Sequence, residues 1–294
     1  MSADVTQDSP IPFERPAWLQ RLRLNYALGA GLTLLAIMVL SAVAAPLLTT
    51  AGPTDVDLMA VRLPPSPEHW FGTDAVGRDV LTRVLYGGQV SLLVAGLGMI
   101  GSLSLGTLMG MLGAFGNGPM RAIVDRVIDI QLAFPYVLLA IAITSVLRPS
   151  LPVLILLMVL AAWAGAARVV RAIALQERAK DYVKAAEVLG ASRLRIALFH
   201  VFPSVVQSLV VLAAMQMAAM IVFEATLSFL GMGVQPPTPS WGGIMLDGKN
   251  YITSSWWLTS LPGLAIVVTS LSLVLIGDGL QARTDAIRSR EGDQ

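Results

Sequence analysis

Long uncharged stretches of apolar residues alternate with polar segments along the chain. The hydrocarbon core of a bilayer is about 30 Å thick, and about 20 apolar residues of helix are needed to cross it. Six stretches approach this length: residues 27–48, 91–115, 130–147, 149–167, 205–230 and 256–277. Arg148 alone separates the third stretch from the fourth, and Pro149 and Pro152 indicate a tight turn there. The pattern therefore predicts an all-α polytopic membrane protein with six transmembrane helices.

The first stretch also has features of a secretory signal peptide. Arg21 and Arg23 precede it, and Ala42-Val43-Ala44 resembles a cleavage site. The apolar core of a signal peptide is about 7–15 residues long, however, and this run is longer. We therefore expect a retained first transmembrane helix over residues 27–48, preceded by an N-terminal tail over residues 1–26.

The composition supports a surface that faces lipid. Of the 294 residues, 55% are hydrophobic and 13% are charged, and this charged share is about half of the usual value of about 25%. The mean hydropathy is +0.71. A net charge of +1 argues against a nucleic-acid-binding protein, which would carry a clustered basic face. The lack of cysteine excludes disulfides, thiol catalysis and cysteine-ligated metals.

The distribution of basic residues predicts the orientation of the chain. With six spans both termini lie on one side of the membrane, and cytoplasmic segments carry the excess of Lys and Arg. Cytoplasmic termini place 15 of the 20 basic residues inside. The remaining five are external: Arg62, Arg78, Arg83, Arg148 and Lys249. We expect an external loop over residues 49–86, a transmembrane core over 87–281 that contains a cytoplasmic loop at 175–203, and a cytoplasmic tail over 282–294.

The second predicted span is rich in glycine. Gly106 and Gly110 form a GxxxG pair, and Gly96, Gly98 and Gly101 precede them. Small residues at this spacing let two helices approach closely in lipid, where burial of apolar surface gives no drive for association. We expect tight helix packing here, and a ligand pathway is the alternative.

One acidic residue, Glu224, is enclosed by the apolar fifth span. Ionisable groups in such places usually face the interior of a bundle or an aqueous cavity, because exposure to lipid is costly. Glu224 is therefore a candidate gate or pathway residue, and a structural hydrogen bond is the alternative. No catalytic residue is predicted.

The cytoplasmic loop has a helix-break-helix pattern. A helix is predicted over residues 176–189, with Tyr182, Ala185, Ala186 and Leu189 on one face. Gly190 is expected to end this helix with a positive φ angle. Ser192 can cap a second helix over residues 193–202, which Pro203 would end. Such a loop either docks into a groove on a soluble partner or lies on the lipid headgroups.

The sequence contains no convincing nucleotide or metal site. Residues 243–250, G-I-M-L-D-G-K-N, differ from a phosphate-binding loop at Asn250, where Ser or Thr would hold magnesium. The two histidines, His69 and His200, are predicted on opposite sides of the membrane. No cofactor or metal is therefore expected on this chain, and nucleotide would have to be bound by another one.

The cytoplasmic loop resembles the EAA loop of the membrane subunits of bacterial ABC importers. Residues 181–192, D-Y-V-K-A-A-E-V-L-G-A-S, carry the resemblance, which continues to Pro203. Three further segments, residues 69–92, 224–242 and 277–280, resemble the dipeptide, oligopeptide and nickel branch of that family. Lys184 departs from the family pattern, where a glutamate leads the motif, and His200 stands at an aliphatic position.

The resemblance implies a permease subunit with the type I ABC importer transmembrane fold. Such a subunit forms half of a translocation pathway, together with a second homologous permease. Two cytoplasmic ATPase subunits would bind ATP and Mg²⁺ and hydrolyse the ATP, and an external binding protein would deliver the substrate. The residues implied in coupling to the ATPases are Lys184, Ala185, Ala186, Leu189, Gly190 and Pro203.

The branch that is resembled predicts peptides as the substrate. Nickel or another small solute is the alternative within the same architecture, although a metal path should offer imidazole, thiolate or carboxylate ligands. An ion-coupled secondary transporter is the alternative from another class, but it would usually show an internal repeat, and none is evident. A channel would need a filter or a charged ring, which the sequence also lacks. The expected location is the bacterial inner membrane.

Overall fold

The computed structural model describes residues 17–292, with side chains described for residues 26–284. Over this part the protein is helical and contains no β-strand, apart from one isolated bridge between Thr73 and Asp79. The helices are α1 Ala17–Val43, α2 Ala45–Leu48, α3 Val80–Phe115, α4 Gly118–Ala133, α5 Tyr136–Val146, α6 Leu151–Arg178, α7 Asp181–Val188, α8 Arg193–Ile196, a π-helical segment Ala197–Val201, α9 Phe202–Phe229, α10 Trp241–Gly248, a 3₁₀ turn Lys249–Tyr251 and α11 Trp257–Gly292.

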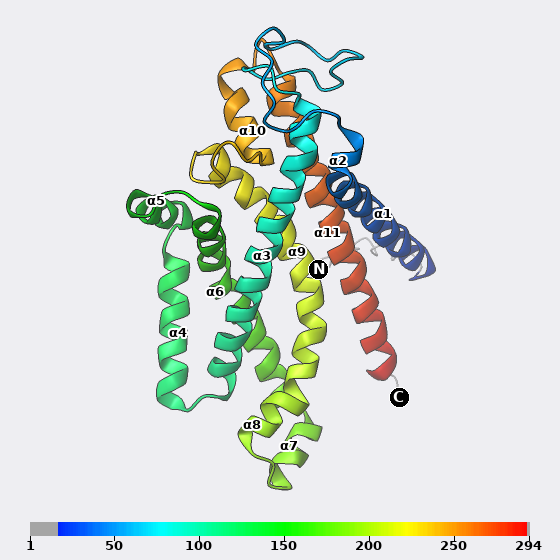
Figure 1. Ribbon diagram of the computed structural model, residues 1–294. Helices are drawn as coiled ribbons and strands as arrows, with labels where there is room; N and C mark the ends of the chain where they lie inside the picture. The colour runs from blue at the N-terminus through cyan, green and yellow to red at the C-terminus, as the bar shows by residue number, and fades with distance from the viewer. Residues whose placement is uncertain (1–16, 293–294) are drawn as a thin grey trace, which may run out of the picture.

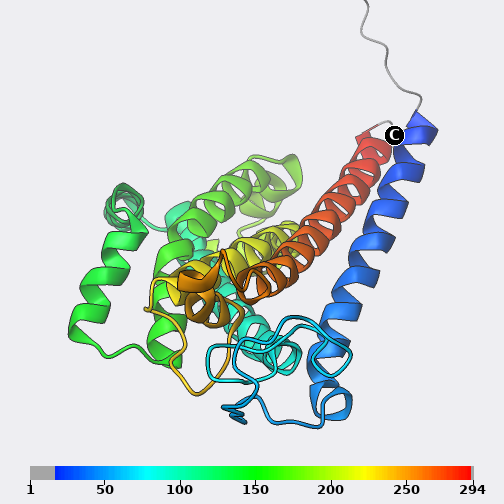
Figure 2. The ribbon, with the colours of Figure 1, turned by 90° about the horizontal axis from the view of Figure 1, so that it is seen from above.

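The long helices form one elongated bundle with distinct ends (Figure 1). One end carries α10 and the chain between α2 and α3, and we call it the α10 end. The opposite end carries α7 and α8, and we call it the α7 end. Seen from above, α1 runs beside α11 at one edge of the bundle, and α4 and α5 stand at the other edge (Figure 2).

Within residues 17–292, five helical segments are long and apolar enough to cross a membrane: α1, α3, α6, the continuous segment from α8 to α9, and α11. A sixth crossing results if α4 and α5 count as one broken span. These two helices meet at an angle of 87°. The prediction of a continuous helix over residues 130–147 is therefore wrong. Pro135 disfavours the helical conformation of Phe134, whose φ and ψ are −86° and 125°.

The ends of the spans differ from the uncharged stretches. The helix α1 begins at Ala17, but the part of it that could cross a membrane begins at Tyr26, one residue from the predicted start at 27. Pro46 lies in the first turn of a separate short helix, α2. The second span begins at Val80, before the predicted start at residue 91. The tail predicted at residues 282–294 is helical up to Gly292. An uncharged stretch indicates the part of a helix that can lie in lipid. The helix itself can extend beyond this stretch, because its backbone hydrogen bonds do not depend on the absence of charge. Residues 1–16 and 293–294 lie outside the described part.

The core of the bundle is the contact between α3 and α6. A Cβ atom built on Gly106 would lie 2.6 Å from the Cβ of Ala166, and one on Gly110 would lie 2.7 Å from the carbonyl oxygen of Ala167. The expectation of tight packing at the GxxxG pair is thus confirmed, and its partner is α6 of the same subunit. The backbones approach this closely because no side chain stands between them.

An ionic cluster ties the α10 end together. The guanidinium of Arg83, in the first turn of α3, contacts Asp74 at 2.5 Å and Asp247 of α10 at 2.9 Å. Arg78 also contacts both carboxylates, at 2.6 and 3.2 Å. The Arg83 and Asp74 side chains are only 5% and 1% exposed. The cluster joins the loop before α3 to α10, across more than 160 residues of sequence.

Candidate functional site

A short helical hairpin projects from the α7 end of the bundle, where the sequence predicts the coupling loop (Figure 1). The predicted helix over residues 176–189 is divided, because α6 ends at Arg178 and α7 begins at Asp181. The phenol oxygen of Tyr182 lies 3.1 Å from a carboxylate oxygen of Glu177 in α6 and 3.2 Å from the backbone carbonyl oxygen of His200, and these two acceptors share its single O–H donor. These bonds hold α7 against the two helices that flank it. Burial and the hydrogen bond to Glu177 raise the pKa of the Tyr182 phenol above its ordinary value.

The break after α7 has the predicted geometry. Gly190 has a φ of 83°. The backbone N–H of Ala191 donates to the carbonyl of Ala186 at 3.0 Å, and that of Gly190 donates to Glu187 at 3.0 Å. This pair of bonds is the Schellman motif, which favours glycine because the motif needs a left-handed residue. The Ser192 hydroxyl accepts from the N–H of Arg195 at 3.3 Å, so the predicted cap of the second helix is also confirmed.

Pro203 does not end the second helix. The chain continues from α8 through the π-helical segment Ala197–Val201 into α9 as one span. Pro203 lies in the first turn of α9, where the missing N–H is tolerated because a π segment there already departs from the α-helical hydrogen-bond pattern. The prediction of a stop at this residue is wrong, and the loop is joined rigidly to the fifth span.

The α7 helix has a buried face and a free face. Val183 is fully buried and packs with Ile196 and Val201, a contact that the sequence analysis missed. Val188 and Leu189 are each 87% exposed, and Ala185 is exposed as well. Lys184 pairs with Asp181 at 3.0 Å, but both side chains are solvent-exposed, and such pairs contribute little stability. The loop therefore presents aliphatic side chains that are largely exposed in this subunit.

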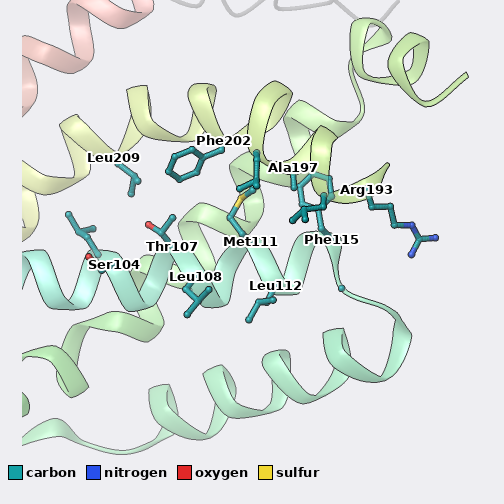
Figure 3. A pocket seen from close by; sticks show the side chains of 14 residues that line it. Ser104, Thr107, Leu108, Met111, Leu112, Phe115, Arg193, Ala197, Phe202 and Leu209 are labelled. Atoms are coloured by element: carbon teal, nitrogen blue, oxygen red, sulfur yellow. The ribbon is translucent and has the colours of Figure 1, made fainter. Parts of the chain in front are cut away.

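Beside this loop, an apolar groove of about 760 Å³ separates the lower part of α3 from α8 and α9 (Figure 3). Leu108, Met111 and Phe115 line it from α3, and Phe202 and Leu209 line it from α9. Arg193 is the one charged residue among those that line this groove, and its side chain extends away at the rim (Figure 3). A groove of this composition suits hydrocarbon chains better than a polar solute.

Glu224 lies in the packed interior of the subunit, near the α10 end. Its side chain has no exposed surface. One carboxylate oxygen accepts a hydrogen bond from Ser91 of α3 at 2.9 Å, and the other accepts from Ser228 at 2.7 Å. The Ser91 hydroxyl in turn accepts from the backbone N–H of Trp241 at the start of α10. Glu224 thus links α9, α3 and α10 through hydrogen bonds, an arrangement that fits the alternative of a structural hydrogen bond. Among the described residues, no group of three His, Cys, Asp or Glu residues could hold a metal ion.

Comparison with known proteins identifies the architecture. Residues 102–287 match the family described as "Binding-protein-dependent transport system inner membrane component". A protein from Brucella abortus, named as a peptide transport system permease, is 42% identical over 273 residues, which cover 93% of this chain and 92% of the relative. The D,D-dipeptide transport system permease DdpC of Escherichia coli is 40% identical and covers 86% and 85%. The dipeptide transport system permease DppC of Bacillus subtilis is 34% identical and covers 96% and 88%.

Solved structures show the same fold. An inward-facing structure of the MetNI methionine ABC transporter contains a chain that aligns with a TM-score of 0.58 at 18% identity. The alignment covers 68% of this chain and 95% of that one. A second crystal form aligns with a TM-score of 0.59. At this identity the likeness concerns the fold, which is that of a type I ABC importer transmembrane subunit.

Proposed function

The chain belongs to the family of binding-protein-dependent transport system inner membrane components, and we propose that it carries peptides through an ATP-driven importer. It is a permease subunit of a multi-subunit ABC transporter in the bacterial inner membrane. The observation that carries the peptide assignment is the set of relatives named as peptide or dipeptide permeases, aligned over most of both chains. No Cys occurs in the chain, and among the described residues no group of three His, Cys, Asp or Glu could hold a metal ion, which disfavours nickel.

The partners of the complex follow from the family and from the exposed loop. A second homologous permease would complete the pathway, and an external binding protein would deliver peptide at the α10 end. Two ATPase subunits would bind ATP and Mg²⁺ and dock at the α7 end. The exposed Val188 and Leu189 suit a groove on such an ATPase, because aliphatic side chains held on a rigid loop gain free energy by burial. Lys184, Ala185, Ala186, Gly190 and Pro203 belong to the same coupling loop.

The orientation has a direct test. We propose that the α7 end is cytoplasmic, with the coupling loop at residues 175–203 inside and the loop at residues 49–86 outside, because 15 of the 20 basic residues then lie inside. The native chain has no cysteine, so single substitutions give a clean labelling assay. An impermeant thiol reagent applied to intact cells should label Pro65→Cys and Pro237→Cys but not Ala191→Cys or Gln281→Cys. Labelling at position 191 would refute the orientation.

The coupling role is tested at Gly190. A Cβ atom here would meet nothing within 4 Å, so the cost of a substitution comes from the backbone φ of 83° alone. A left-handed residue with a Cβ costs about 1–2 kcal/mol. In Gly190→Val the loop should therefore distort while the spans remain intact. The purified complex should either lose ATPase subunits or hydrolyse ATP without transport.

Arg193→Ala is the matched control, because it removes an exposed charge near the same loop and leaves the backbone unchanged. Subunit stoichiometry, ATP hydrolysis and uptake are measured together for both variants. Normal assembly with fully coupled transport in Gly190→Val would contradict the coupling role. Uptake of labelled short peptides by the reconstituted wild-type complex, driven by ATP and not by an ion gradient, tests the function itself. Nickel uptake without peptide uptake would refute the substrate.

A further inference from the structure

Four charged side chains face one another between α4 and α6. Asp125 and Asp129 lie one turn apart on α4, and Arg168 and Arg171 lie three residues apart on α6. Arg168 contacts Asp129 at 2.9 Å, and Arg171 forms an ion pair with Asp125. Together with Ile128 they line a cavity of about 300 Å³. Arg168 and Arg171 are among the 15 basic residues expected on the cytoplasmic side, and the sequence pattern does not pair them with acids.

The depth of the cavity follows from α6. The 17 residues from Leu151 to Ala167 carry no charge and rise about 26 Å along the helix axis. Arg168 therefore lies at the α7 end of the apolar part of the span, near one edge of a hydrocarbon core about 30 Å thick. The cavity opens at that level, beside the broken span formed by α4 and α5.

The charges indicate that this flank faces water rather than lipid. The Arg168 and Asp129 side chains are each 61% exposed, and those of Arg171 and Asp125 are 27% and 33% exposed. Lipid-facing positions at the cytoplasmic boundary favour Lys and Arg, since the leaflet is anionic. Two carboxylates exposed at this level oppose that pattern, and ionisable groups within spans usually line aqueous cavities. The apolar groove of Figure 3 differs, because Arg193 is the one charge among its lining residues.

We propose that this Asp/Arg cavity lines the translocation pathway near the α7 end and transiently binds the two charged termini of a peptide. This rests on the peptide function proposed above. The peptide carboxylate would pair with Arg168 or Arg171, whose guanidinium groups can donate two parallel hydrogen bonds to a carboxylate. The terminal ammonium would pair with Asp129 or Asp125. A cavity of about 300 Å³ is at the small end for a ligand site, so it accepts the ends of a peptide and not a long chain.

The energetics suit transient binding. An exposed ion pair contributes about 0–1 kcal/mol. A zwitterionic peptide brings the same two charges, so it can replace the internal partners of Asp129 and Arg168 at little cost. Release is equally easy, because the side chains pair again with one another when the peptide leaves. A site near the exit of a transporter needs both properties.

The experiment uses the cysteine-free chain in the complete complex, reconstituted in nanodiscs. Leu132→Cys places a thiol on the same face of α4, three residues beyond Asp129, where the native side chain is 42% exposed. Leu108→Cys is the matched control, since Leu108 is 57% exposed and lines the apolar groove. A charged thiol reagent should modify the Leu132→Cys variant faster than the control. Dipeptide with free termini should slow the modification of Leu132→Cys, whereas the N-acetylated dipeptide amide should not.

A second pair of substitutions tests the charges. Asp129→Asn with Arg168→Gln removes both charges of an exposed pair, so folding is expected to be unaffected. The dipeptide concentration that gives half protection of Leu132→Cys should rise, by up to about fivefold for each exposed ion pair that is lost, because such a pair contributes about 0–1 kcal/mol. Transport should weaken for free dipeptide.

Three results would overturn the proposal. Modification of Leu132→Cys as slow as that of Leu108→Cys would show that lipid or the second permease covers the flank. Equal protection by free and blocked peptides would exclude recognition of the termini. If dipeptide still protects Leu132→Cys equally in the variant with Asp129→Asn and Arg168→Gln, but transport is lower, the ion pairs only stabilise the contact between α4 and α6. Peptide uptake by the wild-type complex is measured separately. If uptake occurs, the proposed peptide function holds in each of these three cases, and if no uptake occurs, that function is refuted.

Discussion

Gly106→Ala tests whether the contact between α3 and α6 stabilises the bundle through close backbone approach. The added Cβ would lie 2.6 Å from the Cβ of Ala166, 2.8 Å from the carbonyl oxygen of Trp163 and 3.0 Å from the backbone nitrogen of Ala167. Carbon atoms in favourable contact are about 3.5–4.0 Å apart. Two of the three neighbours are backbone atoms that cannot rotate away. The helices must therefore separate by about 1 Å at this point.

The expected magnitude comes from a comparison with Gly96→Ala on the same helix. A Cβ on Gly96 would meet nothing within 4 Å. Both substitutions replace a helical glycine by alanine, so the gain in helix propensity of about 1 kcal/mol is common to both and cancels. Overpacking costs about 1–3 kcal/mol. Gly106→Ala should thus be less stable than Gly96→Ala by about 1–3 kcal/mol, or about 5- to 150-fold in the unfolding equilibrium.

The assay is reversible unfolding of the purified subunit in mixed micelles, followed by circular dichroism as the denaturing detergent is increased. The wild type and both variants are measured in the same lipid and detergent mixture. Equal stabilities for the two variants would refute the reasoning, because the close approach would then be relieved without cost. A more stable Gly106→Ala would show that α3 and α6 are not in contact at this glycine.

The remaining predictions concern polar contacts. Asp74→Ala leaves the buried Arg83 with one carboxylate and should lower the free energy of unfolding by about 3 kcal/mol or more in the same assay. Asp247→Ala should cost less, because the Asp247 side chain is 34% exposed. The reverse order would contradict the ionic cluster. Glu224→Gln should retain most of the uptake, because an amide can still hydrogen-bond to two serine hydroxyls. Glu224→Leu leaves both hydroxyls without this partner, at a cost in stability of about 1–3 kcal/mol for each. Wild-type folding and uptake in both variants would leave Glu224 without a role. The raised pKa of Tyr182 favours its protonated form in the folded state, so its hydrogen bonds persist below pH 10 and are lost as the pH rises through the higher folded-state pKa. Tyr182→Phe should remove this alkaline step in amide exchange of α7 and speed that exchange at neutral pH, and an unchanged exchange profile would exclude the anchoring role.

Features governed by local rules could be predicted from the sequence. The positions of the five continuous spans follow from the length of apolar runs, because lipid accepts a backbone only where helical hydrogen bonds satisfy it. The positive φ of Gly190 and the cap at Ser192 were also predictable. Each depends on a few neighbouring residues and on the conformations that one residue type allows.

Other local signals were ambiguous, and the surrounding structure decided between their outcomes. Pro135 and Pro203 are both prolines near a span, yet the chain turns by 87° at the first and continues as one helix through the second. The difference is in the backbone around each residue. Phe134 before Pro135 is extended, whereas Pro203 follows a π-helical segment in which the hydrogen-bond pattern is already altered.

The pairing of charged groups was decided by the tertiary structure alone. Arg83 meets Asp247 across more than 160 positions, Glu224 meets Ser91 across 133, and Arg168 meets Asp129 across 39. In the sequence, each of these charged or polar residues stands far from its partner, beside or within an apolar run. Their partners depend on which faces of α3, α4, α6, α9 and α10 pack together, and hydrophobic periodicity cannot specify that in spans that are apolar on all sides. The chemistry of the site therefore follows from helix packing, whereas the spans and the breaks in the coupling loop follow from the local sequence.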